Sequence, residues 1–260
     1  MRKLNWGIIG LGNVAQKFLE GFHGVENSNL LAIASKSETK ALKFKNQFQI
    51  NEEFVFNKYE DLLNCKDIDI IYISLPNSYH YEWILKSIEK NKKVLVEKPA
   101  TLNFEEAQKL SEIIKKKNIF FNEGFMYRHD TQIKKVIELI KNNEIGKPLS
   151  MESSFGVNIL TKKKFYFFQK EKKINKNSRQ FNNQLGGGCI LDLGCYPTSL
   201  SLLICSLIKN INYKKFKITN LVREIGSTGV DINAEAKIIF DNGFNSKVKA
   251  SFKKNLGNNT

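Results

Sequence analysis

The stretch Gly7-Ile8-Ile9-Gly10-Leu11-Gly12-Asn13-Val14-Ala15 decides the fold of this chain. It follows the apolar run that begins at Leu4, and it has the G-x-G-x-x-A form of a dinucleotide-binding fingerprint. In such a turn Gly10 allows a tight reversal, Gly12 lets the backbone approach a pyrophosphate, and Ala15 permits close packing of helix on strand. We therefore expect a dinucleotide to contact Gly10, Leu11, Gly12, Asn13, Val14 and Ala15.

Outward from this turn, apolar strand-like runs alternate with helical stretches. The expected strands lie at residues 4–10, 30–35, 68–75, 93–96 and 119–121. The expected helical segments lie at residues 13–21, 59–63, 81–90 and 103–116, with one more that ends near Gln47. Asn103, with Glu106 three residues later, is a capping-box-like start for the last helix. The alternation implies right-handed βαβ units and a doubly wound parallel sheet, so an α/β Rossmann domain is expected over residues 1–122.

The pattern changes after Asn122, and residues 123–260 are expected to form a second domain. One apolar helical face is formed by Ile133, Val136, Ile137 and Ile140. Strand-like stretches follow at residues 149–155, 219–224, 234–240 and 246–252, and Asp241-Asn242-Gly243 is a good hairpin turn between the last two. Residues 161–184 are rich in Lys, Asn and Gln and contain the aromatic run 165–168. We expect a loop there, packed on the site or on a partner, rather than a regular element.

The composition is that of a globular protein in a reducing compartment. Hydrophobic residues make up 42% of the chain, and no apolar run approaches the roughly 18 to 20 residues of a membrane span. An apolar strand begins directly after Met1-Arg2-Lys3, which leaves no room for a signal peptide. The four cysteines form no C-x-x-C pair, and no Cys/His cluster has zinc spacing. We therefore expect a cytoplasmic protein with no metal site and no membrane partner.

The net charge of +15 has two interpretations. Runs such as Lys115-Lys116-Lys117 and Lys162-Lys163-Lys164 are typical of nucleic-acid surfaces. A chain that is rich in lysine throughout shows the same runs on solvated helix ends and loops. Arginine, the better residue for bidentate contacts to bases and phosphates, is scarce here. We therefore expect no nucleic-acid partner. We expect instead that the positive field attracts small anions.

The end of the second expected strand bears on the choice of cofactor. NAD enzymes usually have an Asp or Glu there, which binds the ribose hydroxyls. This chain has Ser35-Lys36-Ser37 instead, and two hydroxyls with a cation suit a 2′-phosphate. We therefore expect NADP, with NAD as the alternative if Lys36 is only one more solvated lysine.

Two further motifs lie about a hundred residues apart. Glu97-Lys98-Pro99 follows the apolar run 94–96, which puts Lys98 at the mouth of a parallel strand, where open α/β sheets bind ligands. Gly186-Gly187-Gly188 precedes Asp192 and Tyr196, which are four residues apart and so share one face of a helix. A Lys, a Tyr and an Asp beside a dinucleotide site favour an enzyme that moves a hydride and a proton.

Together, these residues resemble the Gfo/Idh/MocA family of glucose–fructose oxidoreductase, inositol dehydrogenase and rhizopine-catabolism proteins. The motifs that show the resemblance are Gly7 to Ala15, Tyr59-Glu60-Asp61-Leu62-Leu63, Ser74-Leu75-Pro76-Asn77-Ser78-Tyr79-His80, Glu97-Lys98-Pro99, Glu123-Gly124-Phe125-Met126-Tyr127-Arg128, and Gly186-Gly187-Gly188 through Asp192 to Pro197. The family implies an N-terminal Rossmann domain and a C-terminal α+β domain with a mainly antiparallel sheet, whose open face covers the nicotinamide. Its members oxidise or reduce sugars, polyols and related alcohols with NAD or NADP.

Tyr196 stands where many relatives have histidine, which resembles the subgroup of dimeric dihydrodiol dehydrogenase, NADP-dependent xylose dehydrogenase and glucose–fructose oxidoreductase. That resemblance implies Lys98 and Tyr196 as the catalytic pair, with Asp192 positioning the substrate. It also implies cofactor contacts from Leu75, Pro76, Asn77, His80, Glu97 and Lys98, and substrate contacts from Met126, Arg128, Asp192 and Tyr196. A phenol is a poor base at neutral pH because its pKa is near 10, and a nearby ammonium favours the phenolate.

Each of these residues also has a purely structural interpretation. A tyrosine on a helix after a glycine run is often only a core residue. Pro197 is expected to kink that helix, which can project Tyr196 into a cleft. We expect His80 to cap or pack near the cofactor, and Cys189 and Cys195 to pack beside the site.

The chain ends at Thr260, whereas members of the resembling family continue with more sheet strands. We therefore expect the second domain to be incomplete, and a homodimer or homotetramer where the sheet is complete. The leading hypothesis is a NAD(P)-dependent oxidoreductase that acts on a sugar, polyol or related secondary alcohol or carbonyl. The alternative is a catalytically weak NADP-binding regulatory protein or a truncated remnant of the same family.

Overall fold

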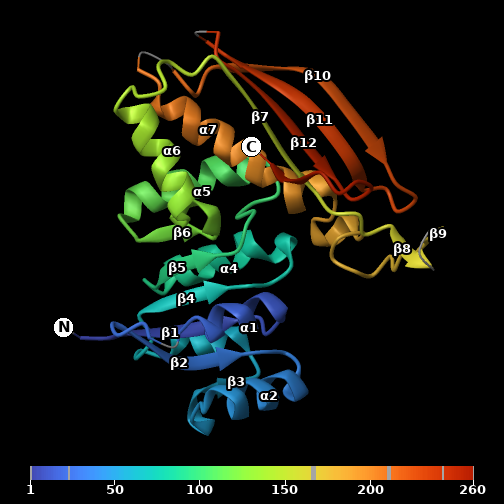
Figure 1. The fold of residues 1–260 in the computed structure, drawn as a ribbon. Coiled ribbons are helices and arrows are strands. Elements are labelled where there is room, and N and C mark those ends of the chain that lie inside the picture. The colour runs from blue at the N-terminus through green and yellow to red at the C-terminus, as the bar shows by residue number, and fades with distance from the viewer. Residues whose placement is uncertain (1, 23, 165–167, 210–211, 242, 260) are drawn as a thin grey trace. The chain divides into compact units, whose positions relative to one another are not determined.

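The chain divides into two units, residues 1–124 and 125–260. The computed structural model describes residues 2–22, 24–164, 168–209, 212–241 and 243–259 (Figure 1). The division lies two residues beyond the expected boundary at residues 122/123. Each unit has its own sheet and its own hydrophobic clusters.

The first unit is the expected doubly wound parallel sheet. Its strand order is β3-β2-β1-β4-β5-β6, and every neighbouring pair is parallel. The strands are β1 (Leu4–Ile9), β2 (Ser28–Ala34), β3 (Val55–Phe56), β4 (Ile70–Ile73), β5 (Lys93–Val96) and β6 (Phe121–Glu123). The helices are α1 (Asn13–Glu20), α2 (Glu38–Phe48), α3 (Tyr59–Asn64), α4 (His80–Glu89) and α5 (Phe104–Lys117). Strand β3 was not expected, because two residues are too short to show a periodicity.

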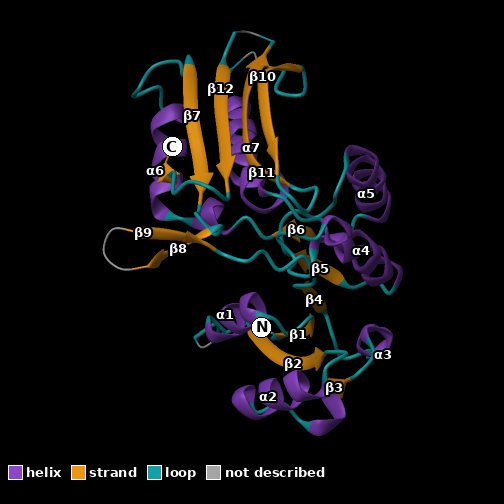
Figure 2. Cartoon of the chain, turned by 90° about the vertical axis from the view of Figure 1, so that its right-hand side faces the viewer, coloured by secondary structure: helices purple, strands orange, loops and turns teal. Residues whose placement is uncertain are grey.

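Both faces of this sheet are covered by helices (Figure 2). Ile71 and Ile73 of β4 pack on one face with Trp83 and Ile84 of α4. The neighbouring Tyr72 points to the opposite face, because successive side chains of a strand alternate, and it joins the cluster formed with α1 and α2. The near-continuous apolar runs of the sequence therefore reflect strands buried on both sides.

Helix α5 begins after the predicted cap Asn103 and ends at Lys117, one residue beyond the expected end. Asn103 accepts the backbone N–H of Glu106 at 2.9 Å, and the Glu106 carboxylate accepts the N–H of Leu102 at 3.0 Å. This reciprocal pair resembles a capping box and confirms the expected start. At the other end Asn118 adopts a left-handed conformation with φ of 47°. The chain turns there, and β6 consequently begins two residues later than the expected strand at 119–121.

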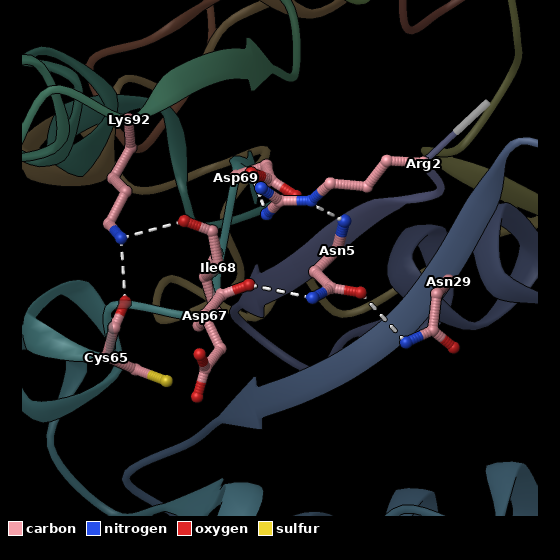
Figure 3. Close-up of polar contacts among 8 residues, drawn as sticks. All are labelled: Arg2, Asn5, Asn29, Cys65, Asp67, Ile68, Asp69 and Lys92. Atoms are coloured by element: carbon pink, nitrogen blue, oxygen red, sulfur yellow. Dashed lines mark hydrogen bonds and ion pairs between the residues drawn. The ribbon is translucent and has the colours of Figure 1, made fainter.

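The amino-terminal edge of the sheet is held by side chains (Figure 3). The buried Lys92 donates to the carbonyl oxygens of Cys65 at 2.7 Å and Ile68 at 2.8 Å, and burial lowers its pKa. Asp69 accepts the backbone N–H of Asn5 at 2.9 Å and the guanidinium of Arg2 at 2.9 Å. These bonds fix the edge opposite the one where parallel sheets bind ligands.

The second unit contains a five-stranded, mainly antiparallel sheet in the order β10-β11-β12-β7-β13. Its strands are β7 (Ser150–Gly156), β10 (Phe216–Ile225), β11 (Asp231–Phe240), β12 (Asn245–Ser251) and β13 (Gly257–Asn259). Strands β12 and β7 are the parallel pair. Helices α6 (Thr131–Lys141) and α7 (Cys195–Leu207) lie on the same side of the sheet (Figure 1), where Ile140, Leu200 and Ile204 pack on Ile238 and Phe240. The α+β architecture is thus as expected.

The segment 161–184 corrects one expectation. It contains the antiparallel hairpin of β8 (Thr161–Lys164) and β9 (Phe168–Glu171), where a loop was expected. The sequence shows no apolar alternation in these two strands, which contain mostly Lys, Gln and Glu. Of the aromatic run at 165–168, residues 165–167 lie outside the described residues. The hairpin turn expected at 241–243 also includes an undescribed residue, 242, but β11 and β12 pair as antiparallel neighbours around it.

One stretch of the second unit corrects the expectation about apolar runs. The stretch Asn183–Leu207 has 25 residues, and an 18-residue window in it has a mean hydropathy of 1.5. By length and composition alone it could cross a membrane, a test that buried core helices also pass. Its last part is α7, whose apolar side chains pack under the sheet in the cluster with Ile238 and Phe240. The sequence expectation overlooked this stretch because glycines and serines interrupt its larger apolar residues. A cytoplasmic location stays a prediction.

Candidate functional site

The fingerprint turn requires glycine at its first position for two reasons. Gly10 has φ of +91°, a conformation that other residues rarely adopt. A Cβ atom at Gly10 would lie 2.9 Å from Leu75 Cδ2 and 3.0 Å from the carbonyl oxygen of Ser74. Ser74 also donates its hydroxyl to the Gly10 carbonyl at 2.6 Å. The turn after β1 is therefore packed directly on the loop after β4.

The second fingerprint glycine faces open space. A Cβ atom at Gly12 would meet no heavy atom within 4 Å. Gly12 is the N-cap of α1, with no side-chain cap and no acidic residue in the first turn. The first N–H groups of a helix lack partners within the helix and attract anions, and so this end suits a pyrophosphate. The side chains of Leu11 and Ala15 are buried in the core, so Leu11 is suited to contact a dinucleotide only through its backbone. Asn13 and Val14, in contrast, are exposed.

The Ser35-Lys36-Ser37 turn follows β2. Ser35 Oγ accepts the N–H of Ser37 at 3.1 Å, and Ser37 Oγ accepts the N–H of Lys40 at 3.5 Å as the N-cap of α2. Lys36 is exposed, and its ammonium lies 5.7 Å from the centroid of the Tyr59 ring. The hydroxyl groups of Ser35 and Ser37 thus accept hydrogen bonds from the backbone of this turn. Lys36, between them, is charged and exposed to solvent.

The loop after β5 contains Lys98, which is half-buried and precedes a cis peptide bond to Pro99. Its neighbour Glu97 accepts the phenol of the buried Tyr72 at 2.6 Å. On the other side of Pro99, the backbone N–H of Ala100 donates to the Glu123 carboxylate at 2.8 Å. Lys98 therefore lies in a loop fixed at both ends, at the carboxyl edge of the sheet.

His80 connects this loop to the loop after β4. The ring is fully buried at the start of α4, with Nδ1 2.7 Å from the Pro99 carbonyl oxygen and Nε2 2.8 Å from that of Leu75. Burial lowers the pKa of His80, while these two carbonyl groups and Glu97 act to raise it. Asn77, from the same loop as Leu75, is also buried. His80 thus packs between these two loops and contacts the backbone of both, and its position beside a cofactor stays a prediction.

In the second unit, Tyr196 lies among aromatic rings. The centroid of its ring is 5.7 Å from that of Phe125, 6.3 Å from that of Tyr127 and 5.3 Å from that of Phe155. These rings come from the segment before α6 and from β7, so two other parts of the unit pack against the half-buried phenol. The sequence did not predict this cluster, because Phe155 lies in a different element.

Asp192 is buried beside Arg179, which sequence reasoning missed. Arg179 Nη1 donates to Asp192 Oδ1 at 3.0 Å, and the guanidinium side chain is 46% exposed. Arg179 is the one arginine in the lysine-rich segment 161–184, and this is the signal that could have marked it. The loop that holds it is tightly packed, because a Cβ atom at Gly187 would lie 2.9 Å from the Arg179 carbonyl oxygen.

A π-helical turn, Ile190–Gly194, connects Asp192 to Tyr196 and runs directly into α7. The sequence predicted an irregular helix at this point from Pro197, which has no N–H to donate. The irregularity is instead a wider turn just before Tyr196. Gly194 lets it approach β12, since an added Cβ atom would be 3.3 Å from Ala250 Cβ. Such turns are frequent at functional sites.

The start of this helical segment depends on Asp231, also missed by the sequence analysis. Asp231 accepts the N–H of Ile190 at 2.7 Å. Gly188 has φ of +111°, and a Cβ atom there would lie 2.6 Å from Asp231 Oδ1. Burial and the neighbouring Asp231 raise the pKa of Cys189, which keeps that buried thiol protonated and agrees with a packing role. Cys195 is half-buried, and its sulfur lies 3.8 Å from the Asp192 carbonyl oxygen.

The expected substrate residues Met126 and Arg128 lie in a short helical turn before α6. Met126 is 75% exposed, and Arg128 donates to Ser199 Oγ at 3.5 Å. Tyr127 shares that hydroxyl at 2.9 Å. Lys98 and the cofactor residues therefore belong to the first unit, whereas Met126, Arg128, Asp192 and Tyr196 belong to the second. Among the described residues, no three His, Cys, Asp or Glu side chains gather as metal ligands.

Comparison with known proteins identifies both units. A family model for oxidoreductases with a NAD-binding Rossmann fold matches residues 4–125, and the GFO/IDH/MocA C-terminal domain model matches residues 133–260. Strand β1 and the fingerprint turn lie in the first match, and α7 and the sheet lie in the second.

Individual proteins are similar over most of this chain. It is 31% identical over 199 residues to the dTDP-3,4-didehydro-2,6-dideoxy-α-D-glucose 3-reductase of Saccharopolyspora spinosa, which covers 76% of this chain and 55% of that protein. It is 25% identical over 247 residues to the D-xylose 1-dehydrogenase (NADP(+)) 2 of Haloferax volcanii, covering 95% of this chain and 69% of that one. The chain thus spans little more than half the length of the first relative.

The fold also resembles that of solved proteins. A 3-ketoreductase from Actinomadura kijaniata, in complex with NADP and TDP-benzene, superposes with a TM-score of 0.80 at 23% identity, over 96% of this chain and 71% of that chain. Since two domain models of one family match the chain almost from end to end, this protein belongs to the Gfo/Idh/MocA family of oxidoreductases.

Proposed function

We propose that this protein is an NADP-dependent oxidoreductase that transfers a hydride between the nicotinamide and a sugar or related secondary alcohol. The observation that supports it most is the backbone cradle at Gly12, open to a pyrophosphate within a domain that matches a NAD-binding model. The relatives named for sugar reduction and xylose oxidation support the substrate class.

In this proposal Tyr196 is the acid–base residue and Lys98 assists it. The bound nicotinamide supplies or accepts the hydride. Tyr196 takes the proton from the substrate hydroxyl during oxidation and returns it during reduction. The Lys98 ammonium favours the phenolate form and orients the substrate oxygen. Asp192 positions the substrate together with Arg179, whose guanidinium it holds at 3.0 Å.

The cofactor preference is proposed from the turn after β2. No carboxylate stands at residues 35–37 to repel a 2′-phosphate, and Lys36 offers it an exposed charge. NADPH is therefore expected to bind more tightly than NADH. Lys36→Asp is expected to shift the preference toward NADH, because it removes a charge-assisted contact that contributes about 1.5 to 3 kcal/mol. Equal affinities of the native protein for both cofactors would contradict this.

The charge of one segment favours an anionic sugar over a neutral one. Residues 157–184 contain eight Lys or Arg side chains and one Glu, and so contribute +7 of the net charge of +15. Arg179, at the end of this segment, has five N–H donors, of which one donates to Asp192. A sugar that carries a phosphate or carboxylate group is the substrate that this segment suits.

The test is a turnover screen of the purified protein with NADP+ and NADPH against aldoses, ketoses, dihydrodiols and nucleotide-linked sugars. We expect turnover with a sugar, and a lower KM for anionic sugars that rises in Arg179→Gln. Tight NADP+ binding without turnover on any of them would favour the alternative, a catalytically weak NADP-binding regulator. Assembly into a homodimer or homotetramer stays a prediction.

A further inference from the structure

The His80 side chain contacts the backbones of two of the loops that are expected to hold the cofactor. It lies at the first residue of α4, and its two ring nitrogens face two carbonyl oxygens, Leu75 after β4 and Pro99 after β5. Both contacts are short, at 2.8 and 2.7 Å, and the ring is 0% exposed.

The two contacts cannot both be hydrogen bonds when the ring is neutral. A neutral imidazole has one N–H donor and one lone pair, whereas the imidazolium has two N–H donors. A carbonyl oxygen is an acceptor only, so the nitrogen with the lone pair repels the oxygen that faces it. The neutral ring therefore holds either the Leu75 loop or the Pro99 loop, and the cation holds both.

We propose that His80 is a proton-dependent positioning residue, which joins the two cofactor loops when it is charged and releases one of them when it is neutral. The role rests on the proposed cofactor site, because the loops matter to function only if they bind the dinucleotide. The charged side chains near the ring are Glu97, which favours the cation, and Lys98, which opposes it.

The groups around the ring shift its pKa in opposite directions. Burial is the largest influence and lowers the pKa of His80, while both carbonyl groups and Glu97 counteract it. The transition is consequently expected below the ordinary value of about 6.5. Affinity for the cofactor is expected to increase as the pH falls through this transition, because the loop that was free no longer has to be ordered on binding.

The experiment measures NADP+ and NAD+ binding by calorimetry between about pH 5.5 and pH 8.5, for the native protein, His80→Gln and His80→Leu. The 2′-phosphate of NADP+ itself titrates near pH 6, but it does so equally in every variant, and NAD+ lacks it. Gln donates at every pH, so His80→Gln is expected to recover part of the affinity lost in His80→Leu. Relative to His80→Gln, the native protein is expected to gain about three- to tenfold in affinity on acidification, which is the contribution of one hydrogen bond.

Ser87→Ala is the matched control, because Ser87 is a fully buried polar residue of the same helix whose hydroxyl donates to Trp83 at 2.7 Å. Its loss is expected to lower stability and leave the pH profile of binding unchanged. The ring itself can be observed by nitrogen-15 NMR, since the chain has three histidines and His80→Gln assigns the signal. Two N–H groups at low pH and one at high pH are expected.

Three results would overturn the proposal. Binding profiles of the native protein and His80→Gln that superimpose at every pH would show that the proton does not act on the cofactor. A single fixed tautomer from about pH 5.5 to pH 8.5 would show that the ring does not titrate. Absence of dinucleotide binding by the native protein would refute the cofactor site and, with it, this role of His80.

Discussion

At the scale of single residues, Tyr196 packs against three aromatic rings. Phe125, Tyr127 and Phe155 have centroids between 5.3 and 6.3 Å from its own. Aromatic neighbours fix the plane of a phenol but do not make it more acidic, because they supply no cation. A nearby ammonium favours the phenolate, and Lys98 is the residue that we propose to supply it.

The first prediction concerns this pair. Tyr196→Phe is expected to lower turnover by about 10²- to 10⁴-fold, the usual contribution of a general acid–base group, with NADP+ affinity nearly unchanged. Lys98→Met is expected to lower it at least as much. Steady-state kinetics under chemistry-limited conditions measure the effect, and Tyr127→Phe is the control, since it removes a hydroxyl from a neighbouring ring. Native turnover in Tyr196→Phe would mean that another group transfers the proton.

The second prediction concerns stability against pH. Since the pKa of His80 is lowered in the folded protein, the unfolded state binds more protons between the folded value and about 6.5. The contribution of His80 to the free energy of unfolding is thus complete above about pH 6.5 and is lost as the pH falls through the folded pKa. Urea unfolding at several pH values should show this decline in the native protein and a flatter curve in His80→Gln. Parallel curves would contradict the direction of the shift.

At the scale of elements, the segment with Asp192 and Tyr196 is shaped by two glycines. Gly188 lets the chain turn beside Asp231, and Gly194 lets the π-helical turn lie on β12. A side chain at either position would push the turn away from the sheet. The position of the phenol therefore depends on residues that have no chemistry of their own.

The third prediction compares two glycines with a similar backbone conformation. Gly188 and Gly229 both have positive φ, +111° and +83°, but a Cβ atom meets Asp231 only at Gly188 and meets nothing within 4 Å at Gly229. Gly229→Ala should cost about 1 to 3 kcal/mol of stability from strain alone. Gly188→Ala should cost more, because Asp231 must also move from the N–H of Ile190. Equal losses in urea unfolding would show that Asp231 yields freely.

Most elements could be predicted from the sequence because their signals are local. Strand β5 has the expected bounds, 93–96, and the capping pair of α5 was visible as Asn103 and Glu106. The expected strand at 68–75 is longer than β4, because the Ile68 carbonyl accepts the Lys92 ammonium instead of a strand partner. The β8–β9 hairpin was missed because its strands have no apolar alternation.

The contacts of the site were harder to predict, since they join distant residues. His80 and Pro99 are 19 residues apart, and Arg179 and Asp192 are 13 apart. The motifs predicted which residues form the site, and the position of His80 near the cofactor stays a prediction. Which backbone atoms the ring would face depends on how two loops pack at the edge of the sheet, and no local pattern encodes that.

At the scale of the whole molecule, charge is distributed unevenly. Nearly half of the net charge of +15 lies in residues 157–184, where Lys162, Lys170 and Lys172 are exposed. Elsewhere lysines pair with acids on the open face of the second sheet, as Lys247 does with Glu235 at 3.0 Å. The excess positive charge creates a field that attracts anions, and this field extends over about one Debye length in salt solution.

The fourth prediction follows from this field. The association rate constant of NADPH is expected to fall by about tenfold as ionic strength rises from low salt to about 0.5 M, with a much smaller change in the dissociation rate constant. Stopped-flow fluorescence measures both. NADH, which lacks the 2′-phosphate, provides the comparison and should show a weaker salt dependence. The same slope for the two cofactors would show that the field does not distinguish their charges.

The buried ammonium of Lys92 has a practical consequence (Figure 3). The chain is rich in lysines, and most of those on its surface can react with an amine-directed reagent at any time. Lys92 is 7% exposed and bound to two carbonyl oxygens, so it can react only after that edge of the sheet opens. The rate at which a reagent labels Lys92, followed by mass spectrometry, therefore reports how often the first unit opens. This measurement uses the native protein and requires no knowledge of its substrate.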